Sequence, residues 1–176
     1  AEYAGLNAAN VIAVSSGTTA LHAGLFALGI KRGDKVACPS FSFIATANSI
    51  LYAGAIPVFV DVKPDTFNID PADLEKRVRK DKKIKAVMPV HLFGRVCEMG
   101  AIRKIAVKYG LKIIEDACQA HGASAEGKMA GNFGEAAAFS LYATKNITSA
   151  EGGLLIVKSA KAAALARMFI NHGMSR

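Results

Sequence analysis

Cysteine is scarce in this sequence and indicates neither a metal site nor a redox centre. The three residues, Cys38, Cys97 and Cys118, are odd in number and lack the short CxxC spacing of zinc and dithiol sites. We therefore expect reduced, mostly buried thiols. The four histidines also lack metal-ligand spacing, and we predict no metal site.

Long apolar runs are missing as well. Charged or polar residues interrupt every apolar stretch before it reaches the roughly 18 residues that a membrane-spanning helix needs. The opening AEYAGLNAANV lacks the basic leader and apolar block of a secretory signal. These two absences predict a protein of the cytoplasm that has no membrane partner.

Basic residues outnumber acidic ones, with a net charge of +8 and a pI near 9.5. Much of this charge lies in KRVRKDKKIK at 76–85, which could bind an anion such as a nucleic acid or a nucleotide-sugar. However, Asp81 interrupts the basic run, and Val78 and Ile84 suggest one buried side. This pattern favours a solvated helix face that runs into a strand, and we expect no nucleic-acid partner.

Hydrophobic residues make up 52% of the chain, which is enough to bury a full core, and short apolar runs alternate with helical patterns. This alternation predicts an α/β fold in which helices sandwich a mostly parallel sheet. Strands are expected at 11–16, 35–40, 58–62, 83–92, 111–117, 136–142 and 152–159. Helices are expected at 17–29, 41–55, 71–80 and 98–110 and from about Ser159, with a glycine-rich loop at 122–134. No internal repeat or linker divides residues 1–176.

Three polar segments follow predicted strands, where an open α/β sheet places its ligand crevice, so we expect them to converge. The first is SSGTTALH at 15–22, where a strand opens into a helix. The free N–H groups of a helix start attract anions, and Gly17 would allow a phosphate to approach the backbone. The alternative is an ordinary helix cap formed by Ser16.

The second segment is IIEDACQAHG at 113–122, which places Glu115 and Asp116 at the end of an apolar strand. A carboxylate at that depth needs a cationic partner, because burial without one would neutralise it. A protonated pyridine nitrogen is such a partner. The alternative is that Asp116 caps the following turn.

The third segment is FSLYATKNITSAEGG at 139–153, which places Lys145 in a loop between two apolar strands. Most lysines are only solvated charges. A lysine that is desolvated close to another cation, however, loses its proton readily and becomes a nucleophile that can form a Schiff base.

In this order, the segments resemble the signature blocks of the DegT/StrS family of pyridoxal-phosphate-dependent sugar-nucleotide aminotransferases, of aspartate-aminotransferase fold type I. The resemblance is carried by SSGTTALH, PSFSFIAT, PVHLFG, IEDACQAHGA and TKNITSAEGG. It implies that residues 1–176 form the pyridoxal-phosphate-binding large domain. Because family members are roughly twice this long, it also implies a fragment without the N-terminal start and the C-terminal small domain.

The resemblance assigns chemistry to three residues. Lys145 would form the Schiff base with the cofactor and later move protons. Asp116 would pair with the pyridinium and keep the ring an electron sink. Gln119 would bind near the phenolic oxygen of the ring. The lysine also argues against the sister dehydratases, which have histidine at that position.

The resemblance places five more residues around the cofactor. Gly17, Thr18 and Thr19 would hold the phosphate at the helix start, and Ser140 would add a hydroxyl. Phe43 would stack on the ring, with ordinary core packing as the alternative.

The implied reaction moves an amino group, by family likeness from glutamate, to a nucleotide-linked keto-sugar, and the implied assembly is a homodimer. Two alternatives stay open: a cofactor-binding fragment without turnover, and a non-catalytic regulator or nucleic-acid binder that uses 76–85. His91 is expected to be a satisfied structural histidine. Ala150 stands where many relatives have glycine, which matters if that position needs a positive φ.

Overall fold

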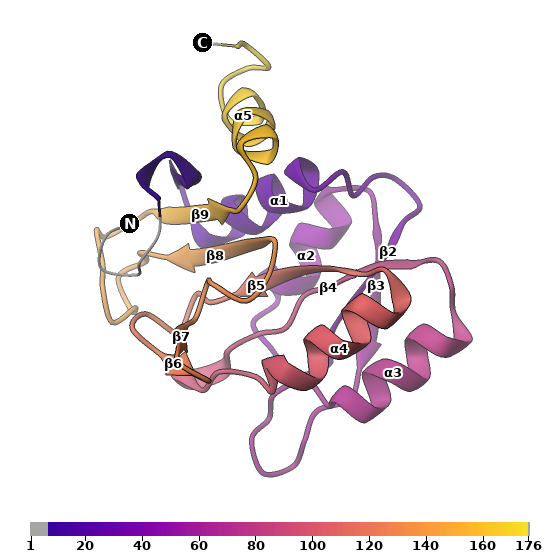
Figure 1. Cartoon of the computed structure of the whole chain (residues 1–176). Helices are drawn as coiled ribbons and strands as arrows, with labels where there is room; N and C mark the ends of the chain where they lie inside the picture. The colour runs from indigo at the N-terminus through magenta and orange to yellow at the C-terminus, as the bar shows by residue number, and fades with distance from the viewer. Residues whose placement is uncertain (1–6, 176) are drawn as a thin grey trace.

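The computed structural model describes residues 7–175 and contains a seven-stranded sheet with helices on both faces (Figure 1). The strand order is β1-β9-β8-β5-β4-β2-β3. The strands are β1 (Val11–Val14), β2 (Lys35–Pro39), β3 (Ile56–Val60), β4 (Ile84–Val87), β5 (Lys112–Asp116), β8 (Ala136–Ser140) and β9 (Gly153–Val157). This architecture confirms the predicted α/β class with a mostly parallel sheet.

The helices divide between the two faces of the sheet and build a core on each. They are α1 (Gly17–Ala27), α2 (Ala45–Tyr52), α3 (Pro71–Lys80), α4 (Met99–Tyr109) and α5 (Ala160–Phe169), with short 3-10 turns at η2 (Ala8–Asn10) and η3 (Leu92–Gly94). Apolar residues of α1, α2 and α5 share one core cluster with the sheet, while those of α3 and α4 belong to a second. Figure 1 shows α3 and α4 side by side, away from α1.

Strand direction brings the ends of distant strands to one edge of the sheet. Strand β9 is antiparallel to both β1 and β8, so β1 runs in the same direction as β8. Strands β2, β3, β4, β5 and β8 are mutually parallel. The segments that follow β1, β2, β4, β5 and β8 therefore emerge at the same edge, which is where an open α/β sheet binds its ligands.

Helix α3 shows how local chemistry sets the element boundaries. The Asp70 side chain accepts a hydrogen bond from the Ala72 N–H, and Pro71 occupies the first turn, where its missing N–H has no cost. Val78 and Ile84 are 2% and 3% exposed, while the basic side chains between them are mostly exposed. The expectation of a solvated helix face that runs into a strand is confirmed.

Several predicted boundaries were wrong. The strand expected at 58–62 lies two residues earlier, at Ile56–Val60, where β3 pairs with β2 and Pro57 is tolerated because β3 is an edge strand. The strands expected at 11–16, 136–142 and 152–159 end at Val14, Ser140 and Val157. The helix expected at 41–55 covers only Ala45–Tyr52. The strand expected at 83–92 ends at Val87, because Pro89 has no N–H to continue the ladder, and the chain then forms η3.

The expected loop at 122–134 was also wrong in part, since it contains a small hairpin of β6 (Ser124–Ala125) and β7 (Lys128–Met129). Its two-residue turn has φ of 52° at Glu126 and 71° at Gly127. Positive φ at both positions suits the twist of a hairpin. Glutamate rarely adopts a positive φ, so the sequence Glu126–Gly127 did not indicate a turn of this type.

The cysteines are free, as predicted, with Cys38 and Cys97 buried and Cys118 half-buried. Within 7–175, no helix has the length and apolar character needed to cross a membrane. In the same range, no group of three or more His, Cys, Asp or Glu side chains is placed to hold a metal. The expectation about a leader rests partly on residues 1–6, which lie outside the described residues.

Candidate functional site

A cavity of about 370 Å³ opens at the shared edge of the sheet. The three predicted segments meet in it, as expected from the strand directions. The described residues that line it are Ser16, Gly17, Thr18, Leu21, Ser42, Phe43, Ala45, Val90, Asp116, Cys118, Gln119, Ser140, Tyr142, Thr144, Lys145 and Glu151. Of the predicted site residues, only Thr19 is not part of this lining.

The start of α1 forms one wall of the cavity. The Ser16 hydroxyl accepts a hydrogen bond from the Thr19 N–H at 3.1 Å, so the predicted cap is present. The Thr19 hydroxyl lies 3.0 Å from the hydroxyls of both Ser15 and Ser16, outside the cavity lining. Gly17 and Thr18 do line it, and helix geometry gives their N–H groups no carbonyl partner within α1. Capping and anion binding are therefore compatible here.

Gly17 lies where no side chain fits. A Cβ atom at this position would stand 2.7 Å from Cys118 Sγ and 2.9 Å from Ser140 Cβ. A Cβ at Gly153 would stand 2.4 Å from the Ser16 backbone. These close approaches seat the helix start directly on β8 and β9, and they leave its backbone bare at the cavity.

Asp116 lies at the end of β5 and is 6% exposed. Its Oδ1 accepts a hydrogen bond from the Cys118 N–H at 3.2 Å, which is the predicted turn cap. Its Oδ2 accepts one from the Thr46 hydroxyl at 2.8 Å. Each carboxylate oxygen has a second acceptor site, so Asp116 keeps the capacity to bind a cationic N–H in the cavity. Sequence reasoning missed Thr46.

The neighbouring carboxylate, Glu115, is fully buried and does not line the cavity. It accepts four hydrogen bonds of 2.7–2.9 Å, from His91 Nε2 and from the backbone N–H groups of Gly131, Phe133 and Gly134. Burial alone raises the pKa of Glu115, but the bonds from His91 and the backbone outweigh it and hold that pKa below its usual value. The two adjacent carboxylates thus have different roles. Glu115 uses its acceptor sites for hydrogen bonds within the fold, whereas Asp116 keeps acceptor sites for a ligand.

His91 is a satisfied structural histidine, as predicted. Its Nδ1 accepts a hydrogen bond from the Cys97 N–H at 3.2 Å, and therefore Nε2 carries the proton that is donated to Glu115. Its side chain is fully buried.

Gln119 is fixed through its carbonyl oxygen. The Phe93 N–H donates to Gln119 Oε1 at 2.9 Å, which leaves the NH₂ group of that side chain as a donor. Phe93 adopts a φ of 53°, an uncommon conformation for an aromatic residue, and is 75% exposed. Sequence reasoning missed this contact, because Phe93 and Gln119 follow different strands of the sheet.

Phe43 and Lys145 complete the cavity. Phe43 is 69% exposed, which excludes the alternative of ordinary core packing. Lys145 is half-buried in the loop between β8 and β9, and its backbone N–H donates to the Tyr142 carbonyl at 2.9 Å. Burial and, after it, the positive charge of Lys145 lower the pKa of His121. Glu151, which sequence reasoning missed, also lines the cavity.

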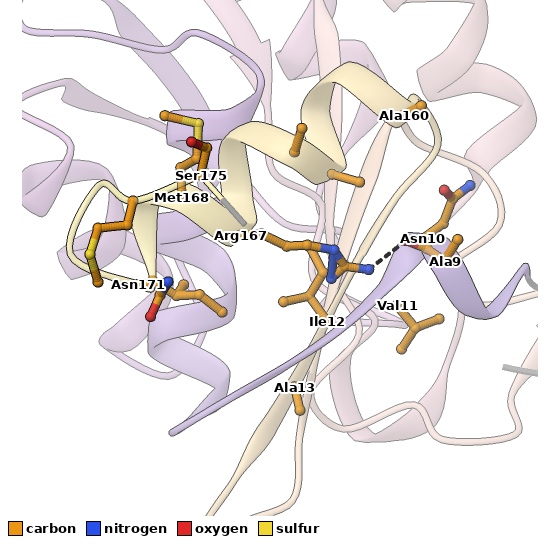
Figure 2. A pocket seen from close by; sticks show the side chains of 14 residues that line it. Ala9, Asn10, Val11, Ile12, Ala13, Ala160, Arg167, Met168, Asn171 and Ser175 are labelled. Atoms are coloured by element: carbon orange, nitrogen blue, oxygen red, sulfur yellow. Dashed lines mark hydrogen bonds between the residues drawn. The ribbon is translucent and has the colours of Figure 1, made fainter.

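A second, larger hollow of about 660 Å³ lies between α5 and the η2–β1 segment. Figure 2 shows Arg167 reaching across it, where its guanidinium donates to the Ala9 carbonyl at 2.7 Å. Among the described residues that line it, Arg167 alone is charged, and the others are mainly apolar or small. None of the predicted site residues borders this hollow. The smaller cavity, where polar groups converge, is therefore the better candidate for chemistry.

The residues of the smaller cavity fit pyridoxal phosphate. Bare backbone at Gly17 suits a phosphate at a helix start. Asp116 has acceptor capacity for a protonated ring nitrogen, Phe43 offers an aromatic face, and Lys145 offers an amine. A helix start suited to an anion, a carboxylate with spare acceptor sites and a lysine therefore line one cavity, and they suit the phosphate, the ring nitrogen and the carbonyl group of that molecule.

Comparison with known proteins agrees with this geometry. Residues 1–176 match the model of the DegT/DnrJ/EryC1/StrS aminotransferase family. GDP-perosamine synthase of Caulobacter vibrioides is 45% identical over 174 residues, covering 99% of this chain and 46% of the relative. A pleiotropic regulatory protein of Geobacillus stearothermophilus is 46% identical over 163 residues, covering 92% and 43%.

The fold is shared with solved structures as well. NtdA of Bacillus subtilis, described with bound cofactor PMP, superposes with a TM-score of 0.87 at 38% identity, covering 94% of this chain and 37% of that one. This chain thus spans less than half the length of these relatives.

Proposed function

The chain belongs to the DegT/DnrJ/EryC1/StrS aminotransferase family, and we propose that residues 1–176 form the pyridoxal-phosphate-binding large domain of a sugar aminotransferase. One observation carries the proposal: the α1 start, Asp116 and Lys145 come from three strand ends and line one cavity. The cofactor-bound state of NtdA, which shares this fold, supports the same cofactor here.

Each wall of the cavity has a task in this proposal. The N–H groups of Gly17 and Thr18 bind the phosphate, with the Ser140 hydroxyl beside them. Thr19 supports this wall indirectly, because its N–H holds the Ser16 cap. Phe43 covers one face of the ring.

Acid–base chemistry falls to three side chains. When bound, the cofactor supplies a carbonyl carbon that accepts the amino group and a ring that takes up electrons. Lys145 would hold the cofactor through its Nζ at that carbon until the amine of the donor displaces it. The freed Lys145 amine would then move a proton between substrate and cofactor in each half of the reaction. Asp116 holds the proton on the ring nitrogen, and the Gln119 NH₂ group donates to the ring oxygen.

For the substrates, we propose glutamate as amino donor and a nucleotide-linked keto-sugar as acceptor. The name of the 45% identical GDP-perosamine synthase supports a nucleotide-sugar. Two exposed aromatic side chains support a homodimer that covers them: Phe43, which lines the cavity, and Phe93, whose N–H binds the cavity residue Gln119.

The test is amino transfer by the full-length protein, with glutamate and a GDP-linked keto-sugar, compared between wild type and Lys145→Ala. We expect transfer by the wild type and none by the variant. Transfer by Lys145→Ala at the wild-type rate would refute the assigned role. Cofactor binding without transfer to any keto-sugar would instead favour a binding domain without turnover.

The similarity to a pleiotropic regulatory protein favours a second candidate, a non-catalytic regulator. Residues 76–85 are the segment through which such a regulator would bind nucleic acid. Exposed Lys76, Arg79 and Lys80 on α3 give that segment a positive surface. Neutralising all three should then abolish salt-sensitive binding to duplex DNA. Absence of such binding in the wild-type protein would eliminate this candidate.

A further inference from the structure

Thr46 connects α2 to the carboxylate that we assign to the ring nitrogen. It lies in the first turn of α2, is 2% exposed, and its hydroxyl is 2.8 Å from Asp116 Oδ2. The hydroxyl of Ser42, which lines the cavity, is 2.8 Å from Thr46 Oγ1. Three oxygen atoms from two strand ends therefore form a continuous chain.

The direction of these hydrogen bonds follows from the chemistry of the groups. A carboxylate only accepts, so the single hydroxyl proton of Thr46 must point to Asp116. Thr46 Oγ1 can then only accept from Ser42, whose proton points to Thr46. Both hydroxyl dipoles are thus aligned toward Asp116 Oδ2, and hydrogen bonds in such chains strengthen one another.

The backbone leaves Asp116 little freedom except rotation of its carboxylate. Its N–H donates to the Pro89 carbonyl at 2.9 Å, and its carbonyl accepts from the His91 N–H at 3.0 Å. The Cys118 N–H binds Oδ1, and Thr46 binds Oδ2. One bond on each oxygen fixes the plane of the carboxylate and leaves one acceptor site per oxygen for a ligand.

From this geometry, and resting on the proposed function, we propose that Thr46 is a positioning residue for the cofactor. Its hydroxyl, supported by Ser42, holds the Asp116 carboxylate in the plane from which it binds the protonated ring nitrogen. The Thr46 contribution therefore depends on that nitrogen. It adds nothing to binding of a ligand that lacks one.

A matched control is Ser49, which lies one turn after Thr46 in helix α2. Ser49 is fully buried, and its hydroxyl donates to the Thr46 carbonyl at 2.9 Å. Ser49→Ala removes a buried hydroxyl from α2 without touching the Ser42–Thr46–Asp116 chain. Thr46→Val keeps the shape of threonine and removes the hydroxyl, while Thr46→Ser keeps the hydroxyl.

The experiment measures dissociation constants in the full-length protein for two ligands. One is pyridoxal phosphate; the other is its carbocyclic analogue, in which a C–H group replaces the ring nitrogen. We expect Thr46→Val to bind pyridoxal phosphate about tenfold more weakly than wild type, as for loss of a hydrogen bond to a charged group. The analogue should bind wild type and variant equally. Thr46→Ser and Ser49→Ala should behave as wild type with both ligands.

An equal loss of affinity for both ligands would show that Thr46 only supports the fold, and unchanged affinity for both would show that it has no role. Either result overturns the inference. If Thr46→Val does not fold, Ser42→Ala takes its place, because half-buried Ser42 is the first hydroxyl of the hydrogen-bonded series. Its loss of affinity should be smaller and should likewise be seen with pyridoxal phosphate and not with the analogue. A wild-type protein that binds neither ligand would instead refute the proposed function itself.

Discussion

Two of the cavity walls, the end of β5 and the loop that carries Lys145, are built in opposite ways. At the end of β5, Glu115 and Asp116 are almost fully buried and receive hydrogen bonds from α2, from His91 and from residues 131–134. The loop at 141–152, which carries Lys145, is mostly exposed, and its hydrogen bonds join residues of the loop to one another or to the adjoining Ser140. The fold therefore fixes the carboxylate rigidly, while the lysine belongs to a locally organised segment.

This difference suits a site in which one group holds a ring still and another moves protons between atoms. A carboxylate that must meet one ring nitrogen gains from rigid placement, because misplacement weakens its only interaction. An amine that serves two carbon atoms in turn needs freedom of its side chain. We expect substitutions in the β5 wall to affect the whole fold, and those in the loop to act locally.

The largest effect should come from Glu115→Ala. The change leaves three buried backbone N–H groups and the His91 side-chain N–H without an acceptor. The free energy of unfolding should therefore fall by about 3–5 kcal/mol. Urea unfolding measures it, with Glu135→Ala as a control at an exposed glutamate that accepts a single backbone hydrogen bond. Similar losses in both variants would contradict the contrast between the walls.

The same residue predicts a pH dependence. Because the folded protein holds the pKa of Glu115 below its usual value, the ionised side chain stabilises the fold at pH values above the ordinary glutamate pKa of about 4.3. This stability is lost as the pH falls through the lower, folded pKa. Unfolding of wild type between pH 6 and roughly pH 3 should follow this course, while Glu115→Ala should lose less stability over the same interval.

A smaller effect is expected from Gly17→Ala, which acts at the third wall. The added Cβ would clash with Cys118 Sγ and Ser140 Cβ, so the start of α1 must move away from the cavity. Overpacking of this kind costs about 1–3 kcal/mol, and the affinity for pyridoxal phosphate should fall about tenfold or more. Gly100→Ala is the control, because its Cβ would meet only the flexible end of Glu126. Equal cofactor affinity in wild type and Gly17→Ala would exclude the helix start as the phosphate site.

The smallest effect is expected from Ala150→Gly, a substitution in the loop at 141–152. Ala150 adopts a φ of 68°, where an alanine costs about 1 kcal/mol more than a glycine. Ala150→Gly should therefore slow amide hydrogen exchange within 141–152 and leave exchange at β5 unchanged. Slower exchange at β5 as well would mean that the two walls are coupled and that the contrast between them is wrong.

The sequence predicted what depends on local pattern and missed what depends on distant contact. Helix α3 was correct at both ends because Asp70 and Pro71 mark its start chemically. The convergence at the sheet edge followed from the order of strands and helices. Thr46 could not be found in this way, because its partner Asp116 lies 70 residues further along the chain.

Two other residues show the same limit. Thr19 was expected in the cavity with Gly17 and Thr18, but the turn of the helix carries its side chain to Ser15 and Ser16. Ala150 is the opposite case, since the glycine of relatives raised the question of a positive φ at this position, and the structure has one.

The most direct test of the central claim is borohydride reduction of the full-length protein with pyridoxal phosphate, followed by peptide mapping of the labelled lysine. The cavity as described predicts one label at Lys145, none in Lys145→Arg, and an unchanged pattern in the control Lys128→Arg, at an exposed lysine of the β6–β7 hairpin. A label on another lysine, or none in the wild type, would contradict it.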